Sequence, residues 1–173
     1  MKRFTLALAL GLSVMALAVS CASTQDKKET VRLVTYNVGV FGKWDLSSED
    51  YTATLMKELD PDAIALQELD SCTTRSGVER FQAETFAAAM GENWGHSYGY
   101  ALKSYKEGSY GIGEVWNKDR LQMKNVFKVM LPKGEATEER ALLVVEYENM
   151  VFASDLPFDP EDGDRMMSLF FSK

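Results

Sequence analysis

The sequence predicts an α/β (α+β) domain in which a mixed β-sheet carries helices on one face. The main observation is the order of the elements, because strand and helix patterns alternate as far as Met90 and only strand patterns follow. The composition agrees, since the 173 residues are 46% hydrophobic and 26% charged, as in one globular domain rather than a disordered chain. A third observation is the run of five apolar residues at 141–145, which is typical of a strand buried on both faces.

Residues 1–20 predict an export signal that precedes the folded domain. Two basic residues are followed by an apolar run over residues 4–19, which is shorter than the roughly twenty residues of a membrane span. Residues 18–21 (AVSC) resemble a bacterial lipobox, in which the signal is cut before the cysteine. The resemblance implies lipidation at Cys21, a tether over 21–30, and localisation in the cell envelope, anchored to a bacterial membrane. A transmembrane anchor is the alternative.

The domain at 31–173 opens with a predicted strand, helix and strand. Residues 31–38 are β-branched and loosely alternating, and residues 62–69 form a compact apolar run of strand length. Between them, residues 48–59 carry apolar side chains at helical spacing behind a capping serine, Ser47. A strand–helix–strand unit of this kind usually pairs its two strands in parallel.

A second amphipathic helix is expected over 78–90, where Gly91 ends it. After it the pattern changes to strands separated by turn residues. A short terminal helix is expected to open at Asp159 and Pro160 and to run to about Phe171. The expected strands are 96–102, 110–116, 121–131, 140–147 and 150–155.

The charge balance excludes one class of function. With 19 Lys and Arg against 26 Asp and Glu, the formal net charge is -7, the wrong sign for tracking a nucleic-acid backbone by charge alone. Nucleic-acid chemistry would therefore need a metal ion to bridge like charges. Two cysteines are too few for a disulfide framework.

Two polar residues lie at the carboxyl ends of the first two predicted strands. These are Asn37 and Glu68, and parallel pairing brings the two strand ends to one edge, where open α/β sheets place ligands. A carboxylate and an amide oxygen are suited to Mg²⁺. The alternative is that Asn37 begins a turn and Glu68 is a solvated strand end.

Several segments together resemble one known family. Residues 31–38, 59–69 and 74–77, which include Tyr36-Asn37 and Gln67-Glu68, have the order and spacing of the endonuclease/exonuclease/phosphatase (DNase I-like) family, and the glycine-rich segment 108–113 resembles another of its strands. The resemblance implies a four-layer sandwich of two sheets flanked by helices. It also implies a metal-dependent phosphoesterase activity, as in nucleases and phosphatases.

The resemblance also assigns roles to three residues. Asn37 would orient the phosphate or the nucleophile as a catalytic residue, Glu68 would bind Mg²⁺ or Mn²⁺, and Arg75 would meet the phosphate of the substrate with its bidentate fork. A phosphate-containing substrate is the partner that this site implies.

The sequence departs from the family where proton transfer is concerned. Residues 153–156 read ASDL where the family has Thr-His-Leu, and the Asp-x-Asn and Ser-Asp-His motifs are not found. We therefore expect a C-terminally incomplete domain that supplies mainly the first mixed sheet and its helices. We expect a lipoprotein of this phosphoesterase family with weakly bound metal and weak or no hydrolase activity; the alternative is a non-catalytic surface binding or interaction module.

One further expectation concerns the apolar strand. Leu142 and Val144 alternate with Leu143 and Val145, and both sets cannot be buried if helices cover only one face of one sheet. We therefore expect self-association, or a partner that covers the apolar face of the sheet.

Overall fold

The computed structural model describes residues 30–43, 48–148, 150–155 and 169–172, and Val31–Lys173 forms one compact unit. The predicted signal, Cys21 and almost all of the predicted tether lie outside the described residues. Within the described ranges, no helix is both long enough and apolar enough to cross a membrane.

The described residues of this unit form two four-stranded sheets. The first is mixed, with strand order β1-β2-β4-β3, and the second has the order β5-β6-β7-β8 and is antiparallel throughout. The expected parallel pairing is confirmed, because β1 and β2 run in parallel with Asn37 opposite Gln67. The strands are β1 (Leu33–Asn37), β2 (Ala63–Ser71), β3 (Trp94–Tyr105), β4 (Gly108–Asn117), β5 (Met123–Met130), β6 (Ala141–Tyr147), β7 (Met150–Asp155) and β8 (Leu169–Ser172).

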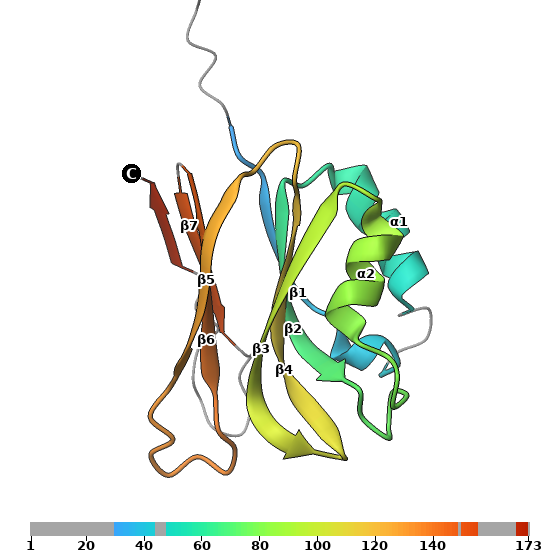
Figure 1. Cartoon of the computed structure of the whole chain (residues 1–173), viewed down its shortest axis with the longest axis vertical. Coiled ribbons are helices and arrows are strands. Elements are labelled where there is room, and N and C mark those ends of the chain that lie inside the picture. Colours follow the sequence, from blue (N-terminus) through green and yellow to red (C-terminus); the bar gives the residue numbers. More distant parts are fainter. Residues whose placement is uncertain (1–29, 44–47, 149, 156–168, 173) are drawn as a thin grey trace, which may run out of the picture. The chain divides into compact units, whose positions relative to one another are not determined.

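Two helices cover one face of the first sheet (Figure 1). Helix α1 (Glu49–Leu59) begins at Ser48, whose side chain accepts a hydrogen bond from the Tyr51 N–H, and α2 (Gln82–Met90) ends at Gly91. Their apolar sides pack with the outward residues of β2 and β4 in one buried cluster that includes Met56, Ile64, Leu66, Phe86 and Val115.

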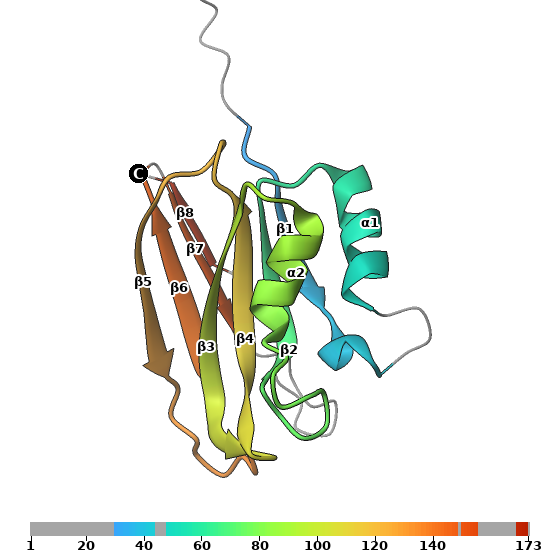
Figure 2. The ribbon, with the colours of Figure 1, turned by 45° about the vertical axis from the view of Figure 1, so that its right-hand side comes forward.

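The second sheet packs against the other face of the first, as both views of the ribbon show (Figures 1 and 2). Alanines from β2, Ile112 and Trp116 from β4, and Leu143, Val145 and Phe152 from the second sheet form one buried cluster. The described chain therefore contains three packed layers: helices, a mixed sheet and an antiparallel sheet.

Two expectations need correction. We expected the chain to supply mainly the first sheet, but half of the described strands form the second one. As a result Leu143 and Val145 are buried between the two sheets, and Val144, on the opposite face of β6, is only 7% exposed while Leu142 is half-buried. The expected terminal helix is wrong at its end, since Leu169–Ser172 forms β8 beside β7; its remaining residues, up to 168, lie outside the described residues.

Candidate functional site

The two polar residues predicted to meet at the sheet edge are in contact. Asn37 is the last residue of β1, and its Nδ2 donates a hydrogen bond to Oε1 of Glu68 over 2.8 Å. Its Oδ1 accepts from the backbone N–H of Gly39 over 2.9 Å. Asn37 therefore begins a turn, as the second alternative expects, and it also holds Glu68.

A β-bulge in β2 decides where Glu68 points. The register of β2 on β4 shifts between Leu66 and Leu69, and Glu68 has a φ of 57°. Gln67 keeps its inward direction and is fully buried, where its Nε2 donates to Oγ1 of Thr35 over 2.9 Å. The bulge thus aims the Glu68 carboxylate at the strand ends.

The turn after β1 is left-handed over three successive residues. Gly39, Val40 and Phe41 have φ values of 53°, 53° and 48°, a conformation that costs about 1–3 kcal/mol for a non-glycine residue. Two contacts from α2 hold the turn: Gln82 Nε2 donates to the Val40 carbonyl over 2.6 Å, and the Phe41 ring stacks on Phe86 with centroids 5.3 Å apart.

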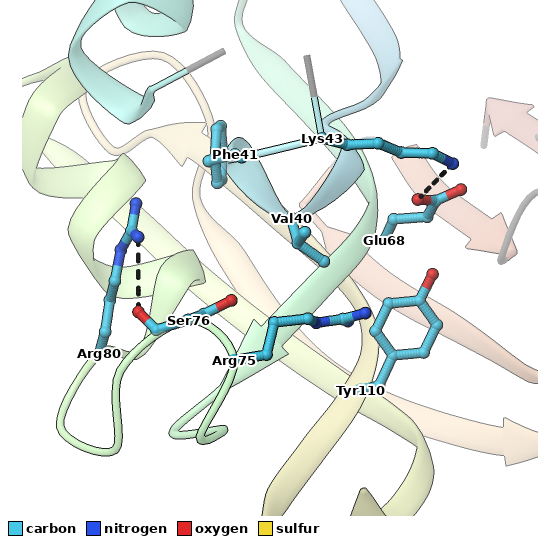
Figure 3. Close-up of a pocket in the computed structure, with 9 residues that line it drawn as sticks. Val40, Phe41, Lys43, Glu68, Arg75, Ser76, Arg80 and Tyr110 are labelled. Atoms are coloured by element: carbon cyan, nitrogen blue, oxygen red, sulfur yellow. Dashed lines mark hydrogen bonds and ion pairs between the residues drawn. The ribbon is translucent and has the colours of Figure 1, made fainter. Parts of the chain in front are cut away.

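This turn returns the chain to Glu68. The backbone N–H of Lys43 donates to the Gly39 carbonyl over 3.0 Å, and the Lys43 ammonium nitrogen lies 3.6 Å from Oε2 of Glu68 (Figure 3). Glu68 therefore has an amide N–H at one oxygen and an ammonium group at the other.

Arg75 is held by a buried carboxylate. Asp70 is fully buried and accepts from Nε and Nη2 of Arg75 over 2.9 and 2.7 Å, and also from the hydroxyls of Thr73 and Ser76 over 2.7 and 2.5 Å. Burial alone would raise the pKa of Asp70, but the hydrogen bonds from Arg75, Ser76 and Thr73 outweigh it and hold the pKa below its ordinary value.

Two tyrosines fix the plane of the same guanidinium. The Arg75 carbon Cζ lies 5.1 Å from the ring centroid of Tyr105 and 5.4 Å from that of Tyr110. The hydrogen bond to Asp70 raises the pKa of Arg75, so the group is a permanent cation. The pKa of Tyr110 is also raised, in this case by burial, so its side chain is a neutral phenol. An arginine held in this way has little side-chain entropy left to lose on binding an anion.

A pocket of about 560 Å³ lies beside Glu68 and Arg75 (Figure 3). Its lining carries three basic side chains, Lys43, Arg75 and Arg80, and one carboxylate, Glu68. Arg80 is itself paired with both carboxylate oxygens of Glu49 on α1. The lining residues are Val40, Phe41, Gly42, Lys43, Glu68, Arg75, Ser76, Arg80 and Tyr110. Each cation is paired with a carboxylate, Lys43 with Glu68, Arg75 with Asp70 and Arg80 with Glu49, so the pocket is lined by ion pairs.

The donors at this edge do not form a metal centre by themselves. Within the described residues, no group of three or more His, Cys, Asp or Glu side chains is placed to hold a metal ion. The single carboxylate of Glu68 is paired with the Lys43 ammonium, and the Asn37 oxygen is turned to the Gly39 N–H. Metal binding at Glu68 stays a prediction.

Comparison with known proteins identifies structures of the same fold, but the sequence comparisons find no relative. No protein-family model matches the sequence, and no curated protein does either. Among solved structures, an endonuclease/exonuclease/phosphatase family protein from Leptotrichia buccalis superposes with a TM-score of 0.54 at 12% identity, over 75% of this chain and 55% of that one. An endonuclease/exonuclease/phosphatase from Beutenbergia cavernae gives the same TM-score at 18% identity, over 68% of this chain and 34% of that one.

The chain therefore has the endonuclease/exonuclease/phosphatase (DNase I-like) fold, as its sequence predicts. It spans about half of the first neighbour's length and about a third of the second's. A shared fold does not transfer an activity, so function must be argued from the pocket.

The structure brings together the predicted residues of the domain and adds others. Glu68 and Arg75 line the same pocket and Asn37 holds Glu68, whereas Cys21 lies outside the described residues. Sequence reasoning missed Lys43, because nothing in the sequence indicates the left-handed turn before it. It also missed Asp70, although a carboxylate at the end of an apolar strand, followed within six residues by Thr, Arg and Ser, is a usable signal.

Proposed function

We propose that this chain binds phosphate groups in the pocket beside Arg75, on a phosphoesterase fold with weak or no hydrolase activity of its own. The observation that carries the proposal is the fixed guanidinium of Arg75, bound to buried Asp70 and lying at a pocket that also contains Lys43. Nε and Nη2 of this guanidinium already donate to Asp70, so Nη1 and the second N–H of Nη2 are the pair that would meet a phosphate. Asn37 would then orient the phosphate or an attacking water.

We expect weak activity because no histidine lines the described pocket and its one carboxylate, Glu68, is paired with Lys43. The single histidine of the sequence, His96, is exposed on β3 with its ring edge-on to Phe81 at 5.6 Å. Since loss of one general base commonly costs 10²- to 10⁴-fold in rate, about 3–5 kcal/mol of barrier, we expect trace hydrolysis at most. Vigorous Mg²⁺-dependent cleavage of a generic phosphodiester, abolished in Glu68→Ala, would contradict this expectation.

Titration with inorganic phosphate tests the binding proposal directly. Arg75→Lys keeps the charge that Asp70 needs but loses the fork, so phosphate affinity should fall by about tenfold or more. The matched control is Arg32→Lys, because Arg32 lies at the start of β1, where it donates to the Leu59 carbonyl, at the opposite end of that strand from Asn37. Equal phosphate affinity in both variants, with circular dichroism showing both to be folded, would reject the proposed role of Arg75.

A membrane anchor is proposed from the sequence alone. We propose that Cys21 is acylated and that the protein is anchored to a bacterial membrane in the cell envelope, because the lipobox-like tetrapeptide follows an apolar run of signal length. Magnesium or manganese would bind weakly, with a dissociation constant of about 1 mM or higher, if Glu68 is the single protein carboxylate available.

One observation favours the interaction-module alternative. Strand β5 is an edge strand of the second sheet, and Met123, Phe127, Val129 and Met130 on it are each 41–43% exposed. A long apolar edge strand is a template for pairing with a second copy of the chain. Sedimentation of the soluble domain distinguishes a dimer from a monomer, and Phe127→Lys should shift the protein toward the monomer.

A further inference from the structure

Lys43 lies against the carboxylate that the family resemblance assigns to a metal ion. Its ammonium nitrogen lies 3.6 Å from Oε2 of Glu68, and both side chains line the pocket beside Arg75. The Asn37 amide presents its N–H to the other oxygen of Glu68 and turns its own oxygen to Gly39. Each group that faces the carboxylate is therefore a donor, which is the environment of a completed ion pair.

The position of Lys43 is specified by the backbone. The left-handed turn over 39–41 leads directly to Lys43, and α2 stabilises the turn through Gln82 and Phe86. The bulge at Glu68 is a second backbone distortion, and it aims that side chain toward the same point. Two such distortions that converge on one ion pair indicate that the pair has a function, since backbone strain is retained where the surroundings impose it and clusters at functional sites.

We infer that the Lys43 ammonium takes the place of a divalent metal ion at Glu68, so that the pocket binds a phosphoryl group without a metal. This inference rests on the proposed phosphate-binding function. Lysine is a common phosphate ligand and acts as a point charge, whereas Arg75 supplies directional hydrogen bonds. Glu68 holds the ammonium in place when the pocket is empty and competes with phosphate for it. A divalent ion could reach Glu68 only by displacing a like charge.

The first experiment measures phosphate binding with and without metal. Inorganic phosphate is titrated into the domain by calorimetry in excess EDTA and again in millimolar Mg²⁺, and methyl phosphate is titrated in the same way to distinguish free phosphate from a phosphomonoester. We expect equal affinity in EDTA and in Mg²⁺. Binding that appears only with Mg²⁺ overturns the inference but leaves the proposed function intact, and no binding in either buffer overturns the proposed function itself.

The second experiment compares variants in EDTA. Lys43→Met should lower phosphate affinity by about tenfold or more, since one charge-assisted contact is lost. The matched control is Lys57→Met, because Lys57 is exposed in the last turn of α1, the end that lies beside the start of β1. A loss of affinity in Lys43→Met that is no larger than in the control overturns the inference.

Glu68→Gln best distinguishes a site that uses Lys43 from a site that uses a metal ion. The two sites predict opposite changes in phosphate affinity. If Lys43 is the cation, removal of the competing carboxylate leaves phosphate affinity in EDTA unchanged or higher. If a metal held by Glu68 is the cation, phosphate affinity in Mg²⁺ falls. A fall in both buffers equally overturns the inference, since it makes Glu68 itself necessary for binding.

Discussion

Replacement of Glu114 by glutamine should remove a large part of the dependence of stability on pH. Glu114 is fully buried in β4, on the face that packs against the second sheet, where the Tyr147 hydroxyl on β6 donates to its Oε1 over 2.5 Å. Its Oε2 has no hydrogen-bond partner among the described residues. Burial raises the pKa of Glu114 well above its ordinary value, and the hydrogen bond from Tyr147 only partly opposes this shift. The carboxyl group therefore stays protonated in the folded protein when it is already ionised in the unfolded chain.

The magnitude follows from proton linkage. Since the pKa is raised on folding, the stabilising contribution is fully present below the unfolded pKa of about 4.3 and is lost as pH rises toward the folded pKa. Over that window the free energy of unfolding falls by at most about 1.4 kcal/mol per pH unit. A domain is typically stabilised by only about 5–15 kcal/mol, so a fall of this slope is measurable. Glu114→Gln keeps the size of the neutral acid and an acceptor for Tyr147, so it should lack this dependence.

Urea unfolding followed by circular dichroism at pH 5, 6 and 7 measures the effect. The difference in unfolding free energy between Glu114→Gln and the wild type should change in favour of the variant as pH rises, by at most about 1.4 kcal/mol per pH unit. Glu58→Gln, at an exposed position of α1, is the control and should run parallel to the wild type. If the curves of Glu114→Gln and the wild type are also parallel, the buried carboxyl does not titrate differently in the two states and the reasoning is refuted.

Three further predictions follow from other sites. Asp70→Asn leaves Arg75 without its buried counter-charge and should destabilise the domain by about 3–5 kcal/mol at pH 7. Because folding lowers the pKa of Asp70, this contribution is present above the unfolded pKa of about 3.9 and is lost as pH falls through the folded pKa, so the variant and the wild type should converge in acid urea titrations. Gly111→Ala should cost about 1–3 kcal/mol in thermal unfolding, because a Cβ there meets the Gly99 carbonyl of β3; an unchanged melting temperature would show that the strands separate freely. Cys21→Ser should move the full-length protein from the detergent phase to the aqueous phase in a Gram-negative host, and wild type that already stays in the aqueous phase would contradict the lipoprotein proposal.

Local pattern alone determined the strand–helix–strand unit of the first sheet and the meeting of two site residues. The strand–helix–strand unit at 31–69 is read from apolar spacing within forty residues, and the parallel pairing of its strands follows from general connectivity rules. Asn37 and Glu68 then meet because each lies at the carboxyl end of its strand. The glycine-rich strand and the family resemblance extended this prediction to the fold, which the solved neighbours confirm.

Tertiary structure alone decided how the apolar strands are covered. A strand that is apolar on both faces reads the same in sequence whether helices or a second sheet lie against it. Here β6 joins a second sheet, so Leu143 and Val145 pack against the first one. The same packing buries Glu114 opposite Tyr147, a contact across 33 residues that no local pattern records.

Tertiary structure also decided the charge of the pocket. Val40 has no residue-level preference for a left-handed φ, so the sequence contains no sign of the turn that returns Lys43 to Glu68. The turn exists because Gln82 and Phe86, some forty residues away, satisfy its carbonyl and its aromatic ring. Local propensities describe each residue's own conformational cost, whereas this pocket depends on distant contacts that outweigh that cost.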